Sequence, residues 1–324
     1  MRVTKIIHVS RLYIIGLCVL FAPGLAAAQK KGIQRPAVDA QQTLAIQVGL
    51  DRAGFSPGEI DGKIGAKTRL ALAEFQKSAN LQSTGAANEE TLAALQIPAE
   101  PVVIHAISPQ DVAGPFIGKM PGDMMESAKL QALGYTTPLE ALAERFHSSQ
   151  ALLTSLNPAA KWEAGETIRV PNVEPFDLPT KGSKPAPGMI EVHLSGSTHS
   201  LVVRDAAGKV LMYAPVTVGS EKDPLPVGSW KVVGVSWNPV FNYNPDLFWD
   251  ADPTHAKAKI PPGPNNPVGV VWVDINKEHF GFHGTPEPST IGRTESHGCV
   301  RLTNWDATKL GRLVNIGTPI VIVQ

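Results

Sequence analysis

Residues 189–212 read MIEVHLSGSTHSLVVRDAAGKVLM, and apolar side chains largely alternate there with polar ones. The alternating apolar positions are Ile190, Val192, Leu194, Leu201, Val203, Val210 and Met212. A period of two predicts β-strands with one buried face. Further short apolar runs follow in SWKVVGV (229–235), VGVVWVDI (268–275) and TPIVIVQ (318–324). The sequence therefore predicts an all-β sandwich or barrel over residues 189–324.

One connection in this β-rich region is unusually long. Residues 238–267 separate two β runs and contain Tyr243 and Trp249. Loops of this length inside a compact domain are commonly functional. We therefore expect residues 238–267, called the covering loop below, to cover a binding site, with Tyr243 and Trp249 contacting the substrate.

Two smaller units precede the β-rich region. Residues 39–95 have helical spacing of apolar positions and a capping residue before the third helix, so they predict a three-helix bundle. In residues 133–173, TTPLE is typical of a helix start, and two helices and a short strand are predicted to follow, an arrangement similar to a LysM-like βααβ unit. We expect residues 96–132 to be a connector and 174–188 a linker. The predicted fold class is multidomain α+β.

The first 28 residues have the pattern of an export signal. Arg2, Lys5 and Arg11 precede and border an apolar run over residues 12–21, and AAA (26–28) supplies a cleavage site. The run is shorter than the roughly 20 residues that span a bilayer. We therefore expect an exported, periplasmic or wall-associated protein with no integral membrane segment after cleavage of the signal.

The charge balance argues against a nucleic-acid partner. The chain has 29 Lys and Arg residues against 29 Asp and Glu residues. A basic patch or stripe is the expected footprint of a nucleic-acid-binding surface. Neither sign is clustered in this sequence, so we expect no such partner.

The stretch SHGCVR (296–301) holds Cys299, one of only two cysteines. The other, Cys18, lies in the export signal, so Cys299 has no internal disulfide partner. A nucleophilic thiol needs a base or a charge-stabilising neighbour. His297 is close in sequence but poorly directed, whereas His283 at the end of an apparent strand can face the thiol. Gly298 permits a tight turn whose N–H groups can stabilise an oxyanion, and Arg301 can bind a carboxylate.

Cys299 has two other possible roles. It could be a buried, inert thiol, but its neighbours and its lack of a disulfide partner favour a reactive one. Alternatively, His283, His297 and Cys299 could bind zinc. The sequence supplies no fourth ligand at metal-site spacing, so we expect neither a metal nor another cofactor.

The residues resemble three known families. GFSPGEIDGKIGAKTRLALAEFQ (54–76) is similar to a peptidoglycan-binding module, and residues 133–173 resemble a degenerate LysM domain, a glycan-binding fold. HGTPEPSTIGRTESHGCVRL (283–302) resembles the active-site segment of the YkuD-type L,D-transpeptidases. PVTVG, PLPVGSWKV and AKIPPGPNNPVG, upstream of that segment, extend this likeness to about 135 residues.

The resemblance to the L,D-transpeptidases implies a role for each motif residue. It implies Cys299 as nucleophile, His283 as general base and the Gly284 carbonyl as the group that orients His283. His297, Gly298 and Cys299 would shape an oxyanion hole. Ser296 and Arg301 would bind the substrate, with Arg301 at its diaminopimelate end.

The implied substrate is a peptidoglycan stem tetrapeptide. Cys299 would attack the third residue, release D-alanine and leave a thioester. An amine of another stem would then give a 3-3 crosslink, a lysine of an outer-membrane protein or lipoprotein would tether that protein, and water would make the protein an L,D-carboxypeptidase. A non-catalytic peptidoglycan-binding adaptor, bound to stem peptides and glycan strands, is the alternative from another functional class.

Overall fold

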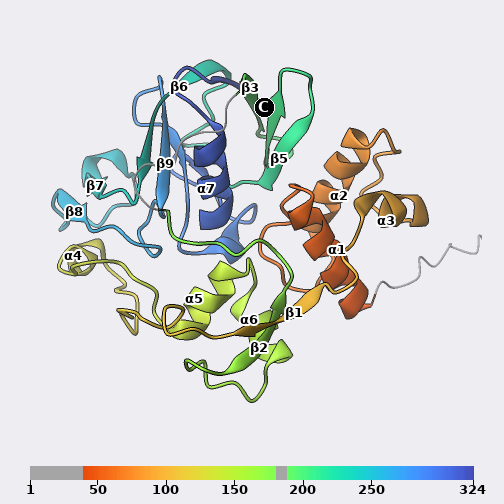
Figure 1. Ribbon diagram of the computed structural model, residues 1–324. Helices are drawn as coiled ribbons and strands as arrows, with labels where there is room; N and C mark the ends of the chain where they lie inside the picture. The colour runs from red at the N-terminus through yellow and green to blue at the C-terminus, as the bar shows by residue number, and fades with distance from the viewer. Residues whose placement is uncertain (1–38, 180–187) are drawn as a thin grey trace, which may run out of the picture. The chain divides into compact units, whose positions relative to one another are not determined.

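The computed structural model describes residues 39–179 and 188–324, which combine helices and sheets (Figure 1). The predicted signal over residues 1–28 and most of the predicted linker lie outside the described residues. Below, residues 39–95 are the helical region, 96–179 the middle region and 188–324 the C-terminal domain. Within the described residues, no helix combines the length and apolar character needed to cross a bilayer.

The helical region contains the three expected helices, α1 (Ala40–Arg52), α2 (Ala66–Ser78) and α3 (Glu89–Leu95). Asp39 accepts a hydrogen bond from the Gln42 N–H and so begins α1, while Asn88 does the same for α3 through the Thr91 N–H. One face of α2 is buried, including Leu72 and Phe75. The spacing of apolar residues thus correctly predicted the helical region.

The middle region is more ordered than the sequence indicated. Its elements are β1 (Val102–Ala106), α4 (Met124–Ser127), α5 (Pro138–Arg145), α6 (Gln150–Leu156) and β2 (Thr167–Pro171). β1 pairs antiparallel with β2, from Val102 opposite Pro171 to Ala106 opposite Thr167. Residues 96–132, expected to be a connector, therefore contain a paired strand that the sequence did not predict. A five-residue strand is too short for its period to be recognised, and its partner lies more than 60 residues later.

The C-terminal domain is built on a curled eight-stranded sheet in the order β11-β10-β9-β6-β12-β3-β4-β5 (Figure 1). Its strands are β3 (Ile190–Ser195), β4 (Ser200–Asp205), β5 (Val210–Pro215), β6 (Gly228–Trp237), β9 (Val271–Ile275), β10 (Gly281–His283), β11 (Val300–Arg301) and β12 (Pro319–Val323). The covering loop contributes a separate pair, β7 (Phe241–Tyr243) and β8 (Ala258–Ile260). The alternating pattern at 189–212 becomes the antiparallel strands β3, β4 and β5.

The C-terminal domain is not all-β, because a helix, α7 (Asn304–Leu313), packs against its sheet (Figure 1). Thr303 caps this helix by accepting from the Asp306 N–H. Trp305 and Leu310 of α7 belong to the same buried core as Val271 and Val273 of β9. The sequence pattern did not predict this helix, because it begins directly after the SHGCVRL motif and its apolar face was not recognised there.

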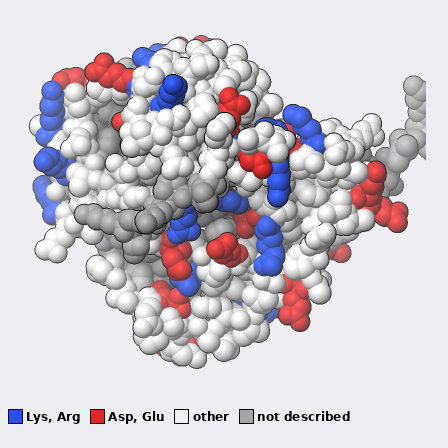
Figure 2. Space-filling view, turned by 45° about the horizontal axis from the view of Figure 1, so that its top comes forward, with Lys and Arg blue, Asp and Glu red and all other residues white. Residues whose placement is uncertain are grey.

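The described residues of all three regions share buried contacts and form one compact unit. Leu44 and Val48 of α1 pack in one core with Leu142 and Leu153 of the middle region. Phe55 packs against Tyr213 of β5 in another core. Figure 2 shows basic and acidic side chains interspersed on one face, in keeping with the balanced composition.

Candidate active site

Two parallel neighbouring strands carry the predicted site. β10 and β11 pair with Phe282 opposite Val300 and His283 opposite Arg301. Cys299 immediately precedes β11, which brings it beside the start of β10. Its Sγ lies 3.5 Å from the His279 carbonyl oxygen. The sheet therefore places His283 opposite Arg301 and Cys299 one residue before that strand, while the thiol itself is directed to the His279 carbonyl.

The His283 ring has a defined position and tautomer. Its Nδ1 lies 2.7 Å from the carbonyl oxygen of Gly284. Because a carbonyl can only accept, Nδ1 carries the proton and Nε2 keeps a free lone pair. The ring stacks on Trp272 with centroids 5.4 Å apart and planes 13° from parallel. His283 is thus held as a neutral imidazole whose Nε2 can accept a proton.

Burial keeps both groups of the Cys299–His283 pair neutral. It lowers the pKa of His283 to about 4, and the Arg301 cation adds to this effect, while the hydrogen bond to Gly284 opposes it. Burial also raises the pKa of the Cys299 thiol, although a Gly281 backbone hydrogen bond and Arg301 oppose that shift. These shifts favour a thiol at Cys299 and a neutral imidazole at His283 at neutral pH rather than a preformed ion pair.

Arg301 supplies positive charge to the site. Burial lowers its pKa, and the neighbouring Cys299 and Glu287 favour its charged form. An arginine remains protonated in proteins across the physiological range. Among residues 39–179 and 188–324, no carboxylate forms a salt bridge with Arg301. Its guanidinium can therefore bind a carboxylate of an incoming ligand.

The turn before Cys299 is fixed by its own hydrogen bonds. Ser296 is buried and its hydroxyl donates to the carbonyl oxygen of Cys299 at 2.5 Å. Gly298 has φ +103°, a conformation in which a side chain would be strained. Ser296 therefore holds the turn in this structure, although the resemblance had implied a substrate contact for it.

The His297 side chain is directed to the covering loop. Its Nε2 lies 2.7 Å from Asp250 Oδ1, and its ring packs against Phe248 and Trp249. This contact agrees with the expectation that His297 is poorly directed as a base for Cys299. Its imidazole instead connects the SHGC turn to the loop.

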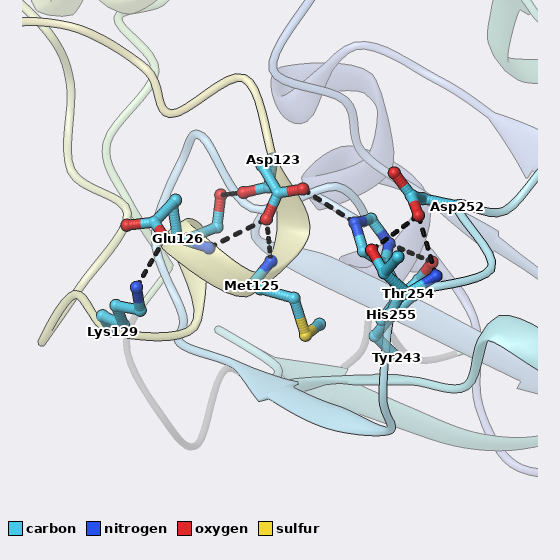
Figure 3. Close-up of polar contacts among 9 residues, drawn as sticks. Asp123, Met125, Glu126, Lys129, Tyr243, Asp252, Thr254 and His255 are labelled. Carbon is cyan, nitrogen blue, oxygen red and sulfur yellow. Dashed lines mark hydrogen bonds and ion pairs between the residues drawn. The ribbon is translucent and has the colours of Figure 1, made fainter.

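Tyr243 and Trp249, both expected to contact substrate, have different environments. Tyr243 is 6% exposed and packs with Leu133 and Ile260, so it is not available for a substrate contact. Its hydroxyl lies 2.9 Å from His255 Nδ1, and His255 Nε2 lies 2.7 Å from Asp123 Oδ2 (Figure 3). Tyr243 therefore anchors the covering loop to the segment that contains α4.

Trp249 remains open to solvent. It is 59% exposed, and its Nε1–H donates to Asp223 Oδ2 at 3.1 Å. The Lys222 ammonium lies 3.4 Å from the ring centroid. Because Trp249 also packs against His297, it lies close to the SHGC turn and can contact a ligand bound there.

Comparison with known proteins agrees with this geometry. Residues 188–322 match the family described as "L,D-transpeptidase catalytic domain". The C-terminal domain is thus similar to the catalytic domain of the L,D-transpeptidases. Residues 39–95 match the family described as "Putative peptidoglycan binding domain".

Individual relatives are named as L,D-transpeptidases. The Bacillus licheniformis protein named "Putative L,D-transpeptidase YkuD" is 29% identical over 187 residues, which cover 57% of this chain and 92% of the relative. "Probable L,D-transpeptidase YbiS" of Escherichia coli is 24% identical and covers 59% of this chain and 61% of its own. An L,D-transpeptidase structure from Mycobacterium smegmatis has a TM-score of 0.35 at 19% identity and covers 51% of this chain and 76% of its own.

The described residues of the C-terminal domain contain no cluster of side chains that could bind zinc. In the part of the chain that the structure describes, no group of three or more His, Cys, Asp and Glu side chains is arranged to hold a metal ion. His297 is directed to Asp250, whereas His283 is directed to Gly284. The three proposed ligands therefore do not converge on one point.

Sequence reasoning missed the residues that support the L,D-transpeptidase site from outside the motif. Trp272 stacks on His283, and Asp123 holds the covering loop through His255. Trp272 lies in the apolar run VGVVWVDI, where it resembles any core position. Asp123 precedes α4 and caps it, which was its only recognisable sequence signal.

Proposed function

We propose that the C-terminal domain is an L,D-transpeptidase that uses Cys299 as its nucleophile on peptidoglycan stem tetrapeptides. The observation that carries this proposal is the hydrogen bond from His283 to Gly284, which leaves Nε2 free as a base on the strand beside Cys299. Arg301 supports recognition of a substrate that has a free carboxylate. The family match supports the reaction type.

The first half-reaction forms a thioester. His283 Nε2 accepts the thiol proton while Sγ attacks the carbonyl carbon of the third stem residue. Backbone N–H groups at Gly298 and Cys299 stabilise the oxyanion, in a turn that His297 and Ser296 hold in place. The C–N bond to the terminal D-alanine then breaks, and His283 returns the proton to the departing amine.

The second half-reaction resolves the thioester with an amine. His283 removes a proton from the attacking amine, the C–S bond breaks and the thiol regains a proton. We propose the side-chain amine of a second stem as the acceptor, which gives a 3-3 crosslink. A lysine of an outer-membrane protein or lipoprotein would give a tethered protein, and water would give a tripeptide.

We propose that the other two regions hold the enzyme on its polymeric substrate. The match of residues 39–95 supports peptidoglycan binding by the helical region. The pairing of β1 with β2 around α5 and α6 supports the LysM-like interpretation, with boundaries moved from 133–173 to about 102–173 and with the short helix α4 inserted between β1 and α5. Sedimentation with purified sacculi tests both roles, and a full chain that stays in the supernatant would contradict them.

The substrate also supports an exported location. We propose that residues 1–28 are a cleaved signal and that the protein works in the periplasm or at the wall. N-terminal sequencing of the protein from a periplasmic extract tests this, and the expected first residue is Gln29. A chain that retains residues 1–28 in the cytosol would contradict the proposal.

The decisive experiment is intact-mass spectrometry after incubation with a disaccharide-tetrapeptide. We expect a covalent adduct on the parent, release of D-alanine, a 3-3 dimer among the products and no adduct on Cys299→Ala. Adduct and tripeptide without dimer would favour the carboxypeptidase or a missing protein acceptor. A folded parent with neither adduct nor turnover would favour the non-catalytic adaptor.

A further inference from the structure

Glu144 is a buried carboxyl group that the proposed mechanism does not use. It lies on α5 of the middle region and is 7% exposed. Its Oε1 accepts hydrogen bonds from Asn304 Nδ2 at 2.9 Å and from the Tyr135 hydroxyl at 3.3 Å. Burial raises the pKa of Glu144 to about 8. A buried carboxyl bonded to neutral donors is costly to retain unless its position matters.

Asn304 connects Glu144 to the C-terminal domain. This side chain is 1% exposed and begins α7. Its Nδ2 donates to the Pro264 carbonyl at 3.1 Å in addition to Glu144, and its Oδ1 accepts from the Val270 N–H at 3.2 Å. Both amide hydrogens and the carbonyl oxygen are thus used, which fixes the orientation of the carboxamide.

The same carboxamide lies directly against the backbone that orients His283. A Cβ placed on Gly284 or on Gly269 would come within 2.1 Å of Asn304 Oδ1. The Gly284 backbone is therefore in contact with Asn304, and its carbonyl is the acceptor for His283 Nδ1–H. A continuous series of contacts runs from Glu144 through Asn304 and Gly284 to His283.

We propose that Asn304, held by Glu144 of the middle region, is a positioning residue that fixes the Gly284 backbone and thereby aligns His283 with Cys299. This inference rests on the proposed function, since it assigns a role in the acylation step. Neither side chain touches the reacting atoms. The middle region thus contributes to the chemistry through one side chain, beside any part it has in binding the wall.

The test compares Glu144→Ala with the parent in single-turnover acylation by the tetrapeptide. Because a small misalignment of a catalytic group is costly, we expect the acylation rate constant to fall about tenfold or more. The half-saturating tetrapeptide concentration should not change, since Glu144 bonds to Asn304 and Tyr135 and to neither Arg301 nor Trp249. Glu144→Gln keeps an acceptor oxygen for Asn304 and should acylate at the parent rate.

Ser56→Ala is the matched control for lost stability. Ser56 bonds Asp306 of α7, two residues after Asn304, but Ser56 has no described contact with Gly284. At a temperature where all variants are folded, we expect Ser56→Ala to acylate like the parent. An equal loss in Ser56→Ala and Glu144→Ala, or a folded Glu144→Ala with the parent rate, would overturn the inference. If Glu144→Ala does not fold, Asn304→Asp replaces it, because Asp keeps the acceptor for Val270 but loses both Nδ2 donors.

A second readout separates this inference from the proposed function. The rate of alkylation of Cys299 by iodoacetamide, measured from pH 5 to 9, reports on the thiol and its base without a peptidoglycan substrate. His283→Ala defines the profile without the base, and we expect Glu144→Ala to shift toward it while Glu144→Gln does not. If the parent does not acylate but Glu144→Ala still shifts the alkylation profile toward that of His283→Ala, the proposed function is refuted and the positioning role is supported. A Glu144→Ala profile identical to the parent's would refute the positioning role.

Discussion

The hydroxyl of Ser56 lies 2.8 Å from Asp306 Oδ2, so a loop of the helical region bonds to α7 across 250 residues of sequence. Both side chains are buried, and Asp306 also accepts from the Thr303 hydroxyl at 2.8 Å. Burial raises the pKa of Asp306 to about 6, while the two hydroxyl donors oppose that shift. The helical region therefore stabilises a carboxylate inside the C-terminal domain.

Ser56→Ala should destabilise the protein in a pH-dependent way. Removing a donor from a buried carboxyl costs about 1–3 kcal/mol. The donor favours the charged form, so the pKa of Asp306 should rise further and the loss of stability should grow as pH rises through about 6. Urea unfolding at pH 5 and pH 8 measures this. A larger loss at pH 5 than at pH 8 would contradict the assignment.

Glu144→Gln should make stability less sensitive to alkaline pH. The folded-state pKa of Glu144 is raised from 4.5 to about 8, so its contribution to stability is fully present below 4.5 and is lost as pH rises through about 8. Glutamine cannot ionise and should not lose this contribution. Unfolding curves at pH 5, 7 and 9 should therefore show the variant gaining stability relative to the parent. A constant difference across that range would mean that Glu144 is already ionised at pH 5.

Acylation should persist to unusually low pH. Because the pKa of His283 is lowered to about 4, its neutral form remains available as a base well below the ordinary histidine value of about 6.5. We expect the single-turnover rate to fall with an apparent pKa near 4, measured with Trp fluorescence as a check on folding. A half-maximal rate near pH 6.5 would show that His283 is solvated in the reacting enzyme.

Tyr243→Phe and Trp249→Ala should separate anchoring from substrate contact. The Tyr243 hydroxyl bonds to His255, so its removal should lower stability by about 1 kcal/mol and leave the half-saturating tetrapeptide concentration nearly unchanged. Trp249 is exposed near the SHGC turn, so Trp249→Ala should raise that concentration severalfold with little effect on the melting temperature. The reverse pattern would return Tyr243 to the substrate site.

Gly284→Ala should damage both stability and acylation. The added methyl would come within 2.1 Å of Asn304 Oδ1, and forcing such an atom into a packed site costs about 1–3 kcal/mol. Gly122→Ala is a matched control, because nothing lies within 4 Å of a Cβ placed there. Thermal unfolding and single-turnover acylation measure the two effects. A Gly284→Ala enzyme with parent values would show that this backbone shifts freely.

The sequence was sufficient for features whose signal is local. The three helices of the helical region follow from capping and spacing, and the juxtaposition of His283, Cys299 and Arg301 follows from one 20-residue motif. It was insufficient where the partner is distant. β1 is recognisable only from its pairing with β2. In the sequence, Glu144 has the pattern of an ordinary exposed helix residue, and only the fold places Asn304, 160 positions later, against it. Tyr243 was predicted to contact the substrate because the sequence of a long loop does not indicate whether an aromatic side chain in it is buried.

The Ser56–Asp306 and Glu144–Asn304 bonds both end on the first turn of α7. A C-terminal domain moved as a cassette to another carrier would leave Asp306 and Asn304 facing foreign surfaces, and it would uncover Tyr213. A chimera would therefore need to transplant the matching faces of the donor's N-terminal regions together with the cassette. Ser56 and Glu144 mark where those faces begin.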